Sequence, residues 1–210
     1  MPAADAAGLT LGDLDILQEL LNIAFGTASA ELAARLDHRV VLSVPDVQVI
    51  PSVLLRYYVG AELKDQAAIS VVEQAFQGDF HGSAFLVLPA SAAGSLLPLV
   101  PAAPEGRPRA EAAQAALAEA GKILIGTCLA RLAELLGTAV TCGPQAVTVE
   151  AQRGAAVRPD LFGTGNPAVV LRTAFNFGHA DVPGYLFLAS SDAAMRWLRP
   201  ALHRFMTQYE

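Results

Sequence analysis

Three polar side chains interrupt an apolar segment near the N-terminus, and their spacing would place them on one helix face. Asp15, Glu19 and Asn22 follow the spacing i, i+4 and i+7 within residues 14–25. On a helix that advances about 100° per residue, they fall within an arc of roughly 60°. A carboxylate and a carboxamide one turn apart can offer an acceptor and a donor to one external group. The segment therefore predicts a polar stripe that could hold a cation and a water molecule in fixed relation.

Other chemistry is poorly supported by the sequence. A polar stripe on an amphipathic helix most often serves solvation, so the stripe alone does not establish catalysis. Cys128 and Cys142 lack metal-ligand spacing, the four histidines are dispersed, and there is no glycine-rich phosphate loop. We therefore expect no bound metal and no cofactor. A small-molecule hydrolase is disfavoured because no nucleophile–base pair is visible.

Composition limits the class of protein. A chain of 210 residues is long enough for one well-buried domain. The net charge is −6 and the basic residues are scattered, which argues against nucleic-acid binding. The most apolar stretch, residues 84–103, contains three prolines, so we expect no membrane insertion. No basic region precedes an apolar run at the N-terminus, and the two cysteines suit buried thiols in a reducing compartment, so we expect a cytoplasmic protein.

The chain contains an internal duplication with an offset of 100 residues. The Gly-Thr pair at 26–27 recurs at 126–127, and Glu19 recurs as Glu119. Further identities at the same offset are Leu17, Ile23, Ala30, Leu32, Ala33, Leu36 and Val40 with residues 117, 123, 130, 132, 133, 136 and 140. We therefore expect a single domain, residues 1–210, built of two repeats at about 9–100 and 109–210.

The sequence pattern of each repeat predicts the same order of elements: a long helix, a strand, a short irregular or helical piece, a hairpin and a closing helix. The expected ranges are 11–37, 39–50, 67–77, 81–88 and 90–99 in the first repeat, and 109–137, 138–149, 167–177, 184–189 and 192–207 in the second. Two long helices on an antiparallel sheet would bury both apolar helix faces in one core. The expected fold class is α+β, a pseudo-two-fold duplication with shorter peripheral helices.

Two local features refine this expectation. The apolar alternation of residues 40–49 changes phase across Pro45 and Asp46, which predicts a β-bulge there, where a proline is tolerated. Gly26 and Gly126 would let the two long helices approach each other closely.

The full spacing, Asp15-x3-Glu19-x2-Asn22-x22-Pro45, resembles the signature of the CheC/CheX/FliY family of chemotaxis phosphatases. The residues from Leu20 to Gly26 also look like the helix of that family. Length and duplication resemble CheC more than the shorter CheX or the longer FliY. The resemblance covers essentially the whole chain and implies the CheC-like fold.

The resemblance implies a hydrolase of two-component signalling that removes the aspartyl phosphate of a CheY-type response-regulator receiver domain. Asn22 would orient a water molecule in line with the phosphorus, and Glu19 would pair with a lysine of the receiver. Asp15 and Pro45 would be supporting residues, with Pro45 setting the shape of its strand. The receiver would supply the Mg²⁺, so this chain itself would bind no cofactor.

The second repeat departs from the signature. Glu119 is retained, but Ala115 replaces the acid, Lys122 replaces the amide and Gln145 stands where the proline is expected. We predict that this degenerate site is catalytically inactive and that Lys122 pairs with Glu119. The alternative function is a non-catalytic CheC-like adaptor that binds a receiver domain or a CheD-like deamidase.

Overall fold

The computed structural model describes residues 9–36, 40–42, 46–63, 65–96, 108–151, 167–177 and 181–207. In the first repeat the elements are α1 (Leu11–Leu36), β1 (Val40–Leu42), β2 (Asp46–Pro51), a 3-10 turn η1 (Ser52–Leu54), α2 (Leu55–Glu62), β3 (Ala68–Gly78), β4 (Gly82–Pro89) and α3 (Ala92–Leu96). In the second repeat they are α4 (Arg109–Leu135), β5 (Val140–Ala151), β6 (Pro167–Phe177), β7 (Asp181–Ser190) and α5 (Asp192–Thr207). The expected long helix, strand, hairpin and closing helix are present in both repeats. The short piece expected between β5 and β6 lies outside the described residues.

The strands form one antiparallel sheet whose order reveals the duplication. The order is β1-β6-β7-β4-β3-β5, and β2 also pairs with β6, beyond the end of β1. The first strand of each repeat pairs with the hairpin of the other repeat, and β4 and β7 meet in the middle. Exchanging the two repeats leaves this order unchanged. The predicted α+β fold with two long helices on an antiparallel sheet is confirmed.

The β-bulge predicted around Pro45 is visible in the strand pairing. Leu42 pairs with Phe175, whereas Asp46 pairs with Arg172, so the register slips by one residue between them. Within the expected strand 39–50 the structure describes β1 and β2, which lie on either side of this slip. Pro45 itself lies outside the described residues.

The second repeat contains the same irregularity in β5. Gln74 of β3 pairs with Gln145, but Phe76, only two residues later, pairs with Cys142. The extra residue of β5 falls at Gly143 and Pro144, between those two partners. A bulge bends and twists its strand, and both repeats therefore bend the strand that follows their long helix.

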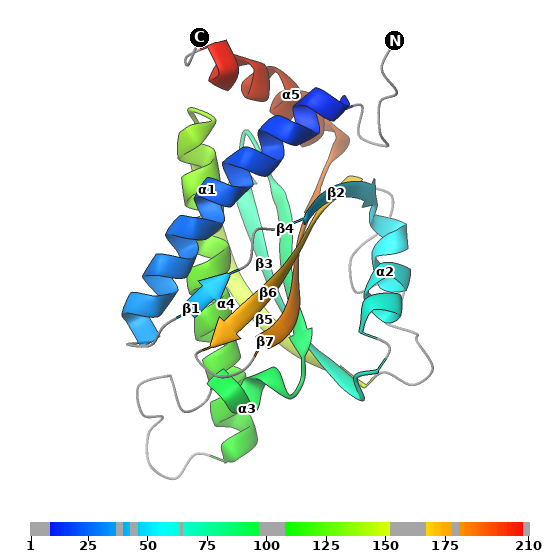
Figure 1. Cartoon of the computed structure of the whole chain (residues 1–210), viewed down its shortest axis with the longest axis vertical. Coiled ribbons are helices and arrows are strands. Elements are labelled where there is room, and N and C mark those ends of the chain that lie inside the picture. The colour runs from blue at the N-terminus through cyan, green and yellow to red at the C-terminus, as the bar shows by residue number, and fades with distance from the viewer. Residues whose placement is uncertain are drawn as a thin grey trace.

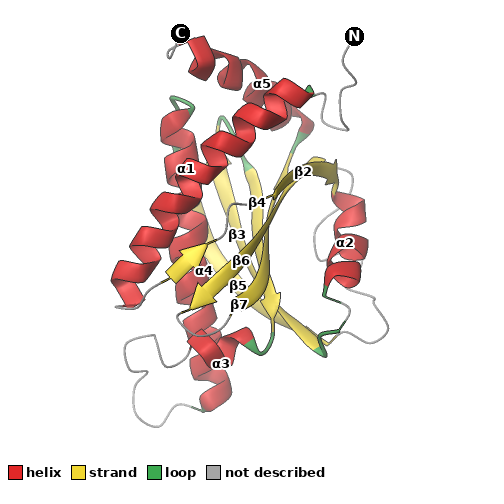
Figure 2. Cartoon of the chain, in the orientation of Figure 1, coloured by secondary structure: helices red, strands yellow, loops and turns green. Residues whose placement is uncertain are grey.

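Helices cover the two faces of the sheet unequally (Figures 1 and 2). The long helices α1 and α4 cross on one face, and α2 lies on the other. Leu20, Leu21 and Phe76 belong to the larger core under the long helices. Leu55, Val59 and Phe187 belong to the smaller core under α2. No helix in the described part of the chain is long and apolar enough to cross a membrane.

The peripheral helices repeat the same symmetry. In Figure 1, α5 lies at the N-terminal end of α1, and α3 lies at the N-terminal end of α4. The closing helix of each repeat therefore packs against the long helix of the other repeat. This exchange ties the two repeats into one domain.

The prediction for Gly26 and Gly126 was wrong. A Cβ atom built on either glycine would have no neighbouring atom within 4 Å, so neither marks a close approach of the helices. Gly121 is the close approach instead: a Cβ there would lie 2.7 Å from Cγ1 of Val72. Because Gly121 has no side chain, α4 can lie directly on β3.

Candidate functional site

The α1 stripe lies on the solvent side of that helix. Asp15 and Glu19 are exposed, and Asn22 is half-buried. Leu17, Leu20 and other apolar residues of α1 are buried because the helix packs on α4 and on the sheet. The burial pattern therefore places the three polar residues on one helix face, as their spacing predicts, with Asn22 deeper than the two acids.

The Asn22 carboxamide has an unusual environment. Its Oδ1 atom is buried and has no hydrogen-bond partner among the described residues. A buried acceptor without a partner costs about 1–3 kcal/mol, so most proteins avoid it. Rotation about the last side-chain torsion is soft for an asparagine.

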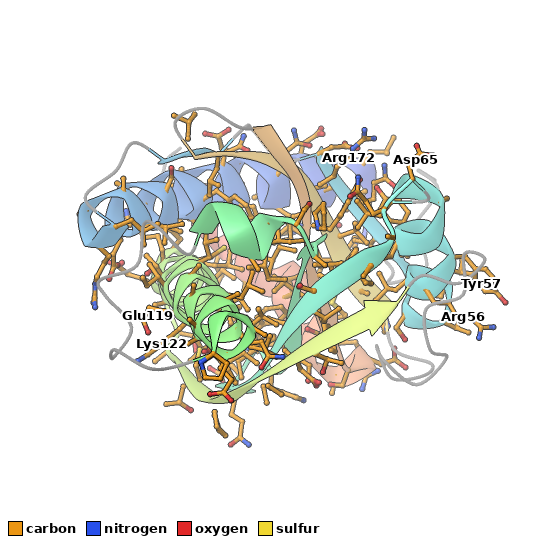
Figure 3. All side chains as sticks on the ribbon, turned by 90° about the horizontal axis from the view of Figure 1, so that it is seen from below. Arg56, Tyr57, Asp65, Glu119, Lys122 and Arg172 are labelled. Carbon is orange, nitrogen blue, oxygen red and sulfur yellow. The ribbon has the colours of Figure 1, made fainter. Side chains whose placement is uncertain are left out.

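The second repeat places Glu119 and Lys122 beside an open pocket of about 350 Å³. Figure 3 shows both residues on the outer side of α4. Glu119 is half-buried and Lys122 is exposed. They form no ion pair with each other or with another described residue, so the prediction that Lys122 pairs with Glu119 was wrong.

The rest of the pocket comes from α1, from the neighbouring part of α4 and from the two strands beneath. Its other lining residues are Glu31, Arg35, Gln74, Ile123, Gly126, Thr127, Cys142 and Gly143. The Glu31 carboxylate accepts a hydrogen bond from the Thr127 hydroxyl at 2.8 Å and contacts the Arg35 guanidinium at 3.3 Å. Cys142 is exposed, so the expectation of buried thiols is confirmed for Cys128 and wrong for Cys142. Partial desolvation raises the pKa of the Cys142 thiol.

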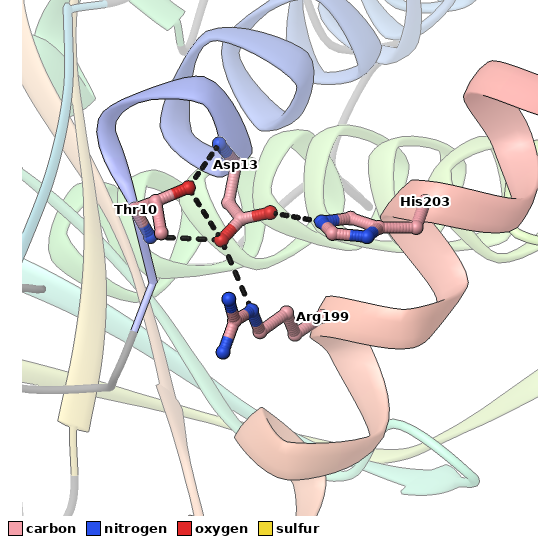
Figure 4. Close-up of polar contacts among 4 residues, drawn as sticks. All are labelled: Thr10, Asp13, Arg199 and His203. Atoms are coloured by element: carbon pink, nitrogen blue, oxygen red, sulfur yellow. Dashed lines mark hydrogen bonds and ion pairs between the residues drawn. The ribbon is translucent and has the colours of Figure 1, made fainter. Parts of the chain in front are cut away.

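A second polar cluster, absent from the sequence predictions, joins the first and last helices (Figure 4). Asp13 is only 1% exposed. Its Oδ1 lies 2.6 Å from Nε2 of His203, and its Oδ2 lies 3.3 Å from Nε of Arg199. Oδ2 also accepts hydrogen bonds from the backbone N–H and the hydroxyl of Thr10, both at 2.8 Å.

Two of the four residues in this cluster, Thr10 and Asp13, follow a local pattern that can be seen in the sequence. Thr10 and Asp13 are three residues apart at the start of α1, the spacing of a capping box. The Thr10 hydroxyl oxygen completes the box by accepting the Asp13 N–H at 3.2 Å. The contacts with Arg199 and His203 join residues about 190 positions apart, which local patterns cannot reveal.

The pKa of Asp13 reflects competing effects. Burial by itself would raise the pKa, but the two Thr10 hydrogen bonds and the hydrogen bond and charge of His203 outweigh it. The net result is a pKa below the ordinary value of 3.8. Asp13 is therefore ionised at neutral pH, and its contacts tie α5 to the beginning of α1.

A metal ion needs a particular arrangement of side chains around it. Among the described residues, no group of three or more histidine, cysteine, aspartate or glutamate side chains is arranged to hold a metal ion. The stripe on α1 and the pocket on α4 offer carboxylates, an amide and an ammonium group. These groups can bind and orient another molecule through hydrogen bonds and charge.

Comparison with known proteins supports the fold. No family model matches the chain. FliY from Thermotoga maritima superposes with a TM-score of 0.71 at 20% identity, over 96% of this chain and 99% of that one. A chain of the FliG–FliM complex from H. pylori gives 0.58 at 10% identity, over 90% and 100%. A chain of the CheX–CheY–BeF3–Mg2+ complex from Borrelia burgdorferi gives 0.50 at 17% identity, over 85% and 99%.

These identities are low, so the likeness concerns the fold. The superpositions extend over nearly the full length of the known structures. They include both repeats of this chain, because each covers at least 85% of it. The chain has the fold of Thermotoga FliY and shares it with chains of the FliG–FliM and CheX–CheY complexes.

Proposed function

We propose that this protein is a CheC-like phosphatase that hydrolyses the aspartyl phosphate of a CheY-type receiver domain. The proposal joins two kinds of support. The signature Asp15, Glu19, Asn22 and Pro45 resembles that of the chemotaxis phosphatases. The fold is that of FliY and of a chain solved in complex with CheY, BeF3 and Mg2+.

In this proposal the site acts by positioning. Glu19, exposed on α1, pairs with a cation of the receiver and fixes the docking geometry. Asn22 accepts a hydrogen bond from a water molecule and holds it in line with the phosphorus. Asp15 adds a polar contact at the edge of the interface. The receiver supplies Mg²⁺, and no covalent intermediate on this chain is needed.

The observation that carries the proposal is the unsatisfied Oδ1 of Asn22. An amide oxygen without a partner in the described part of the chain can accept a hydrogen bond from a water molecule or from a bound partner. The neighbouring Glu19 is exposed on the same face and makes no ion pair with a described residue. Glu19 is therefore open to a docking protein, and the Asn22 oxygen has no hydrogen bond among the described residues that docking would have to break.

Replacing Asn22 tests the assignment. Asn22→Ala should lower the rate of phosphate release from the phosphorylated receiver by about 10²-fold or more, because water is no longer oriented. The variant should keep or raise its thermal unfolding midpoint, since the lost oxygen has no hydrogen-bond partner among the described residues and its burial costs stability. A matched control is Ser29→Ala, a half-buried polar residue of α1 outside the signature, which should keep the wild-type rate. A wild-type rate for Asn22→Ala would overturn the proposal.

A non-catalytic adaptor is the second candidate, and the comparisons favour it as an alternative. The same fold occurs in a chain of the FliG–FliM complex, an assembly of proteins bound to one another. The degenerate second repeat also shows that this chain does not keep the full signature everywhere. An adaptor would bind the phosphorylated receiver without accelerating its decay, so the same assay separates the two functions.

A further inference from the structure

The α4 pocket is the counterpart of the proposed active site under the pseudo-two-fold symmetry. The sheet order is unchanged when the repeats are exchanged, and α1 and α4 are equivalent helices. Glu119 and Lys122 therefore occupy the positions of Glu19 and Asn22. The pocket that they line also contains Gly126 and Thr127, the counterparts of the first Gly-Thr pair. The second repeat thus keeps an open surface where its signature has changed.

The charges that line this pocket fall into two groups. Glu31 and Arg35 contact each other, and Glu31 is further satisfied by Thr127. The charged groups of Glu119 and Lys122 make no ion pair or hydrogen bond with another described residue. Within the described part of the chain, the pocket therefore offers one carboxylate and one ammonium group without a partner, three residues apart on one helix.

The second repeat has the ammonium group of Lys122 where the first repeat has the amide of Asn22. The two groups differ in their ability to position a water molecule for hydrolysis. An asparagine both donates and accepts, so it can hold a water molecule and a second group together. A lysine has three donors and no acceptor, so it can bind phosphoryl oxygens but cannot accept a hydrogen bond from water. Charge-assisted hydrogen bonds of this kind are stronger than neutral ones.

We propose that the α4 pocket is a second binding site for the phosphorylated receiver, which it holds without hydrolysing. Lys122 contacts the phosphoryl oxygens and Glu119 contacts a cation next to them. The inference rests on the proposed function of the first site and assigns a role to the degenerate one. Each chain would then carry one hydrolytic site and one site that only retains the partner.

The pairing of charges favours a receiver over a free anion. A free phosphate would satisfy Lys122 but would be repelled by Glu119 on the same helix. A surface that presents a phosphoryl group beside a cation satisfies both. The CheX–CheY complex contains BeF3 together with Mg2+, so an anionic group and a cation do occur together in that assembly. A chain of that complex has the same fold as this protein.

The test measures how the receiver bound to BeF3 and Mg²⁺ (the loaded receiver) binds to a variant whose α1 site has been inactivated. The probe is the purified receiver with BeF3 and Mg²⁺, titrated calorimetrically into the full chain carrying Glu19→Lys and Asn22→Ala. We expect this variant to bind one receiver and to leave the decay of the acetyl-phosphate-loaded receiver unaccelerated. Adding Lys122→Glu should weaken binding at least tenfold, whereas Lys122→Arg should retain it. Arg131→Glu, a charge reversal on α4 away from the pocket lining, is the matched control and should change little.

The two proposals fail in different ways. If Asn22→Ala alone keeps full phosphatase activity, the function of the first site is wrong. If that activity is lost but the disabled chain binds no receiver, or binds it equally well with Lys122→Glu, only the second site is refuted. Equal binding of the unloaded receiver would also refute it, because Lys122 would then not be reading the phosphoryl group. Circular dichroism of each variant checks that Lys122, an exposed residue, has no effect on folding.

Discussion

A single carboxylate at the beginning of α1 connects the two ends of this chain. Asp13 satisfies the first turn of its own helix through Thr10 and contacts Arg199 and His203 of α5. The Arg199 and His203 side chains are both about half exposed, whereas Asp13 is buried, so Asp13 depends most on these contacts. A buried ionised group needs its partners, and removal of either side is costly.

Asp13→Asn should therefore destabilise the protein by about 1–3 kcal/mol at neutral pH, since the substitution removes the charge but keeps the shape. Urea unfolding monitored by circular dichroism measures the difference. Asp15→Asn, a neighbouring exposed acid, should change the free energy of unfolding by no more than about 0.5 kcal/mol. Equal effects of the two substitutions would contradict the structural role of the cluster.

The pH dependence follows from the lowered pKa of Asp13. A group whose pKa is lower in the folded state contributes stability above its unfolded pKa, here 3.8, and loses it as the pH falls through the folded value. The stability gap between the wild type and Asp13→Asn should therefore narrow as the pH falls below the ordinary aspartate pKa of 3.8. Urea titrations at pH 7, 5 and 3 check this. A gap that widened on acidification would show the opposite sign of linkage.

At the scale of elements, α4 owes its position to one missing side chain. Gly121 is buried where α4 meets β3, and Val72 occupies the space that a Cβ atom would need. The side chain of a valine has little freedom to move aside because it is branched at Cβ. In the first repeat the equivalent position is Leu21, a buried core residue, so the two long helices pack differently on the sheet.

Gly121→Ala should lower the free energy of unfolding by about 1–3 kcal/mol, because overpacking outweighs the better helix propensity of alanine. Gly26→Ala is the matched control: a Cβ there has no neighbour within 4 Å. It should stabilise the helix by up to about 1 kcal/mol. Chemical denaturation with unchanged m-values would measure both. A stable Gly121→Ala protein would mean that the helix can move away from the sheet without loss.

At the scale of the whole molecule, the exchange of strands and peripheral helices makes the two repeats equivalent in space. The first strand of each repeat completes the sheet of the other, so neither repeat has a finished core alone. Both long helices therefore lie on the same face of the sheet, each with an outer surface toward solvent. One symmetric framework carries two sites with different residues.

This equivalence predicts that activity can be moved between the repeats. We expect Ala115→Asp together with Lys122→Asn to restore activity in the inactive Asn22→Ala background. The rate of receiver dephosphorylation should rise at least about tenfold, because an asparagine that positions water contributes about 10²-fold to the rate. Recovery should remain below the wild-type rate, since Gln145 still replaces the proline of the signature. Phosphate release is the measurement. Lys122→Ala in the same background, which supplies no amide, should recover nothing.

Local patterns in the sequence were sufficient for much of the fold. The period of the apolar residues predicted both long helices and both hairpins, and the phase change near Pro45 predicted the register slip between Leu42 and Asp46. The prediction that Gly26 and Gly126 mark a close approach of the two long helices was wrong, because the space around a glycine depends on what packs against it. The pairing of Lys122 with Glu119 failed for a related reason, since helix spacing permits an ion pair without requiring it.

The sequence by itself determined the elements, their duplication and the polar stripe on α1, because all three depend on the spacing of neighbouring residues. Only the tertiary structure decided which strand of one repeat joins the hairpin of the other, why Gly121 is small, and that Asp13 meets His203. It also decided that Asn22 keeps an unsatisfied oxygen and that Lys122 faces an open pocket. These features arise from contacts between segments far apart in the chain, where no periodic pattern relates one residue to the other.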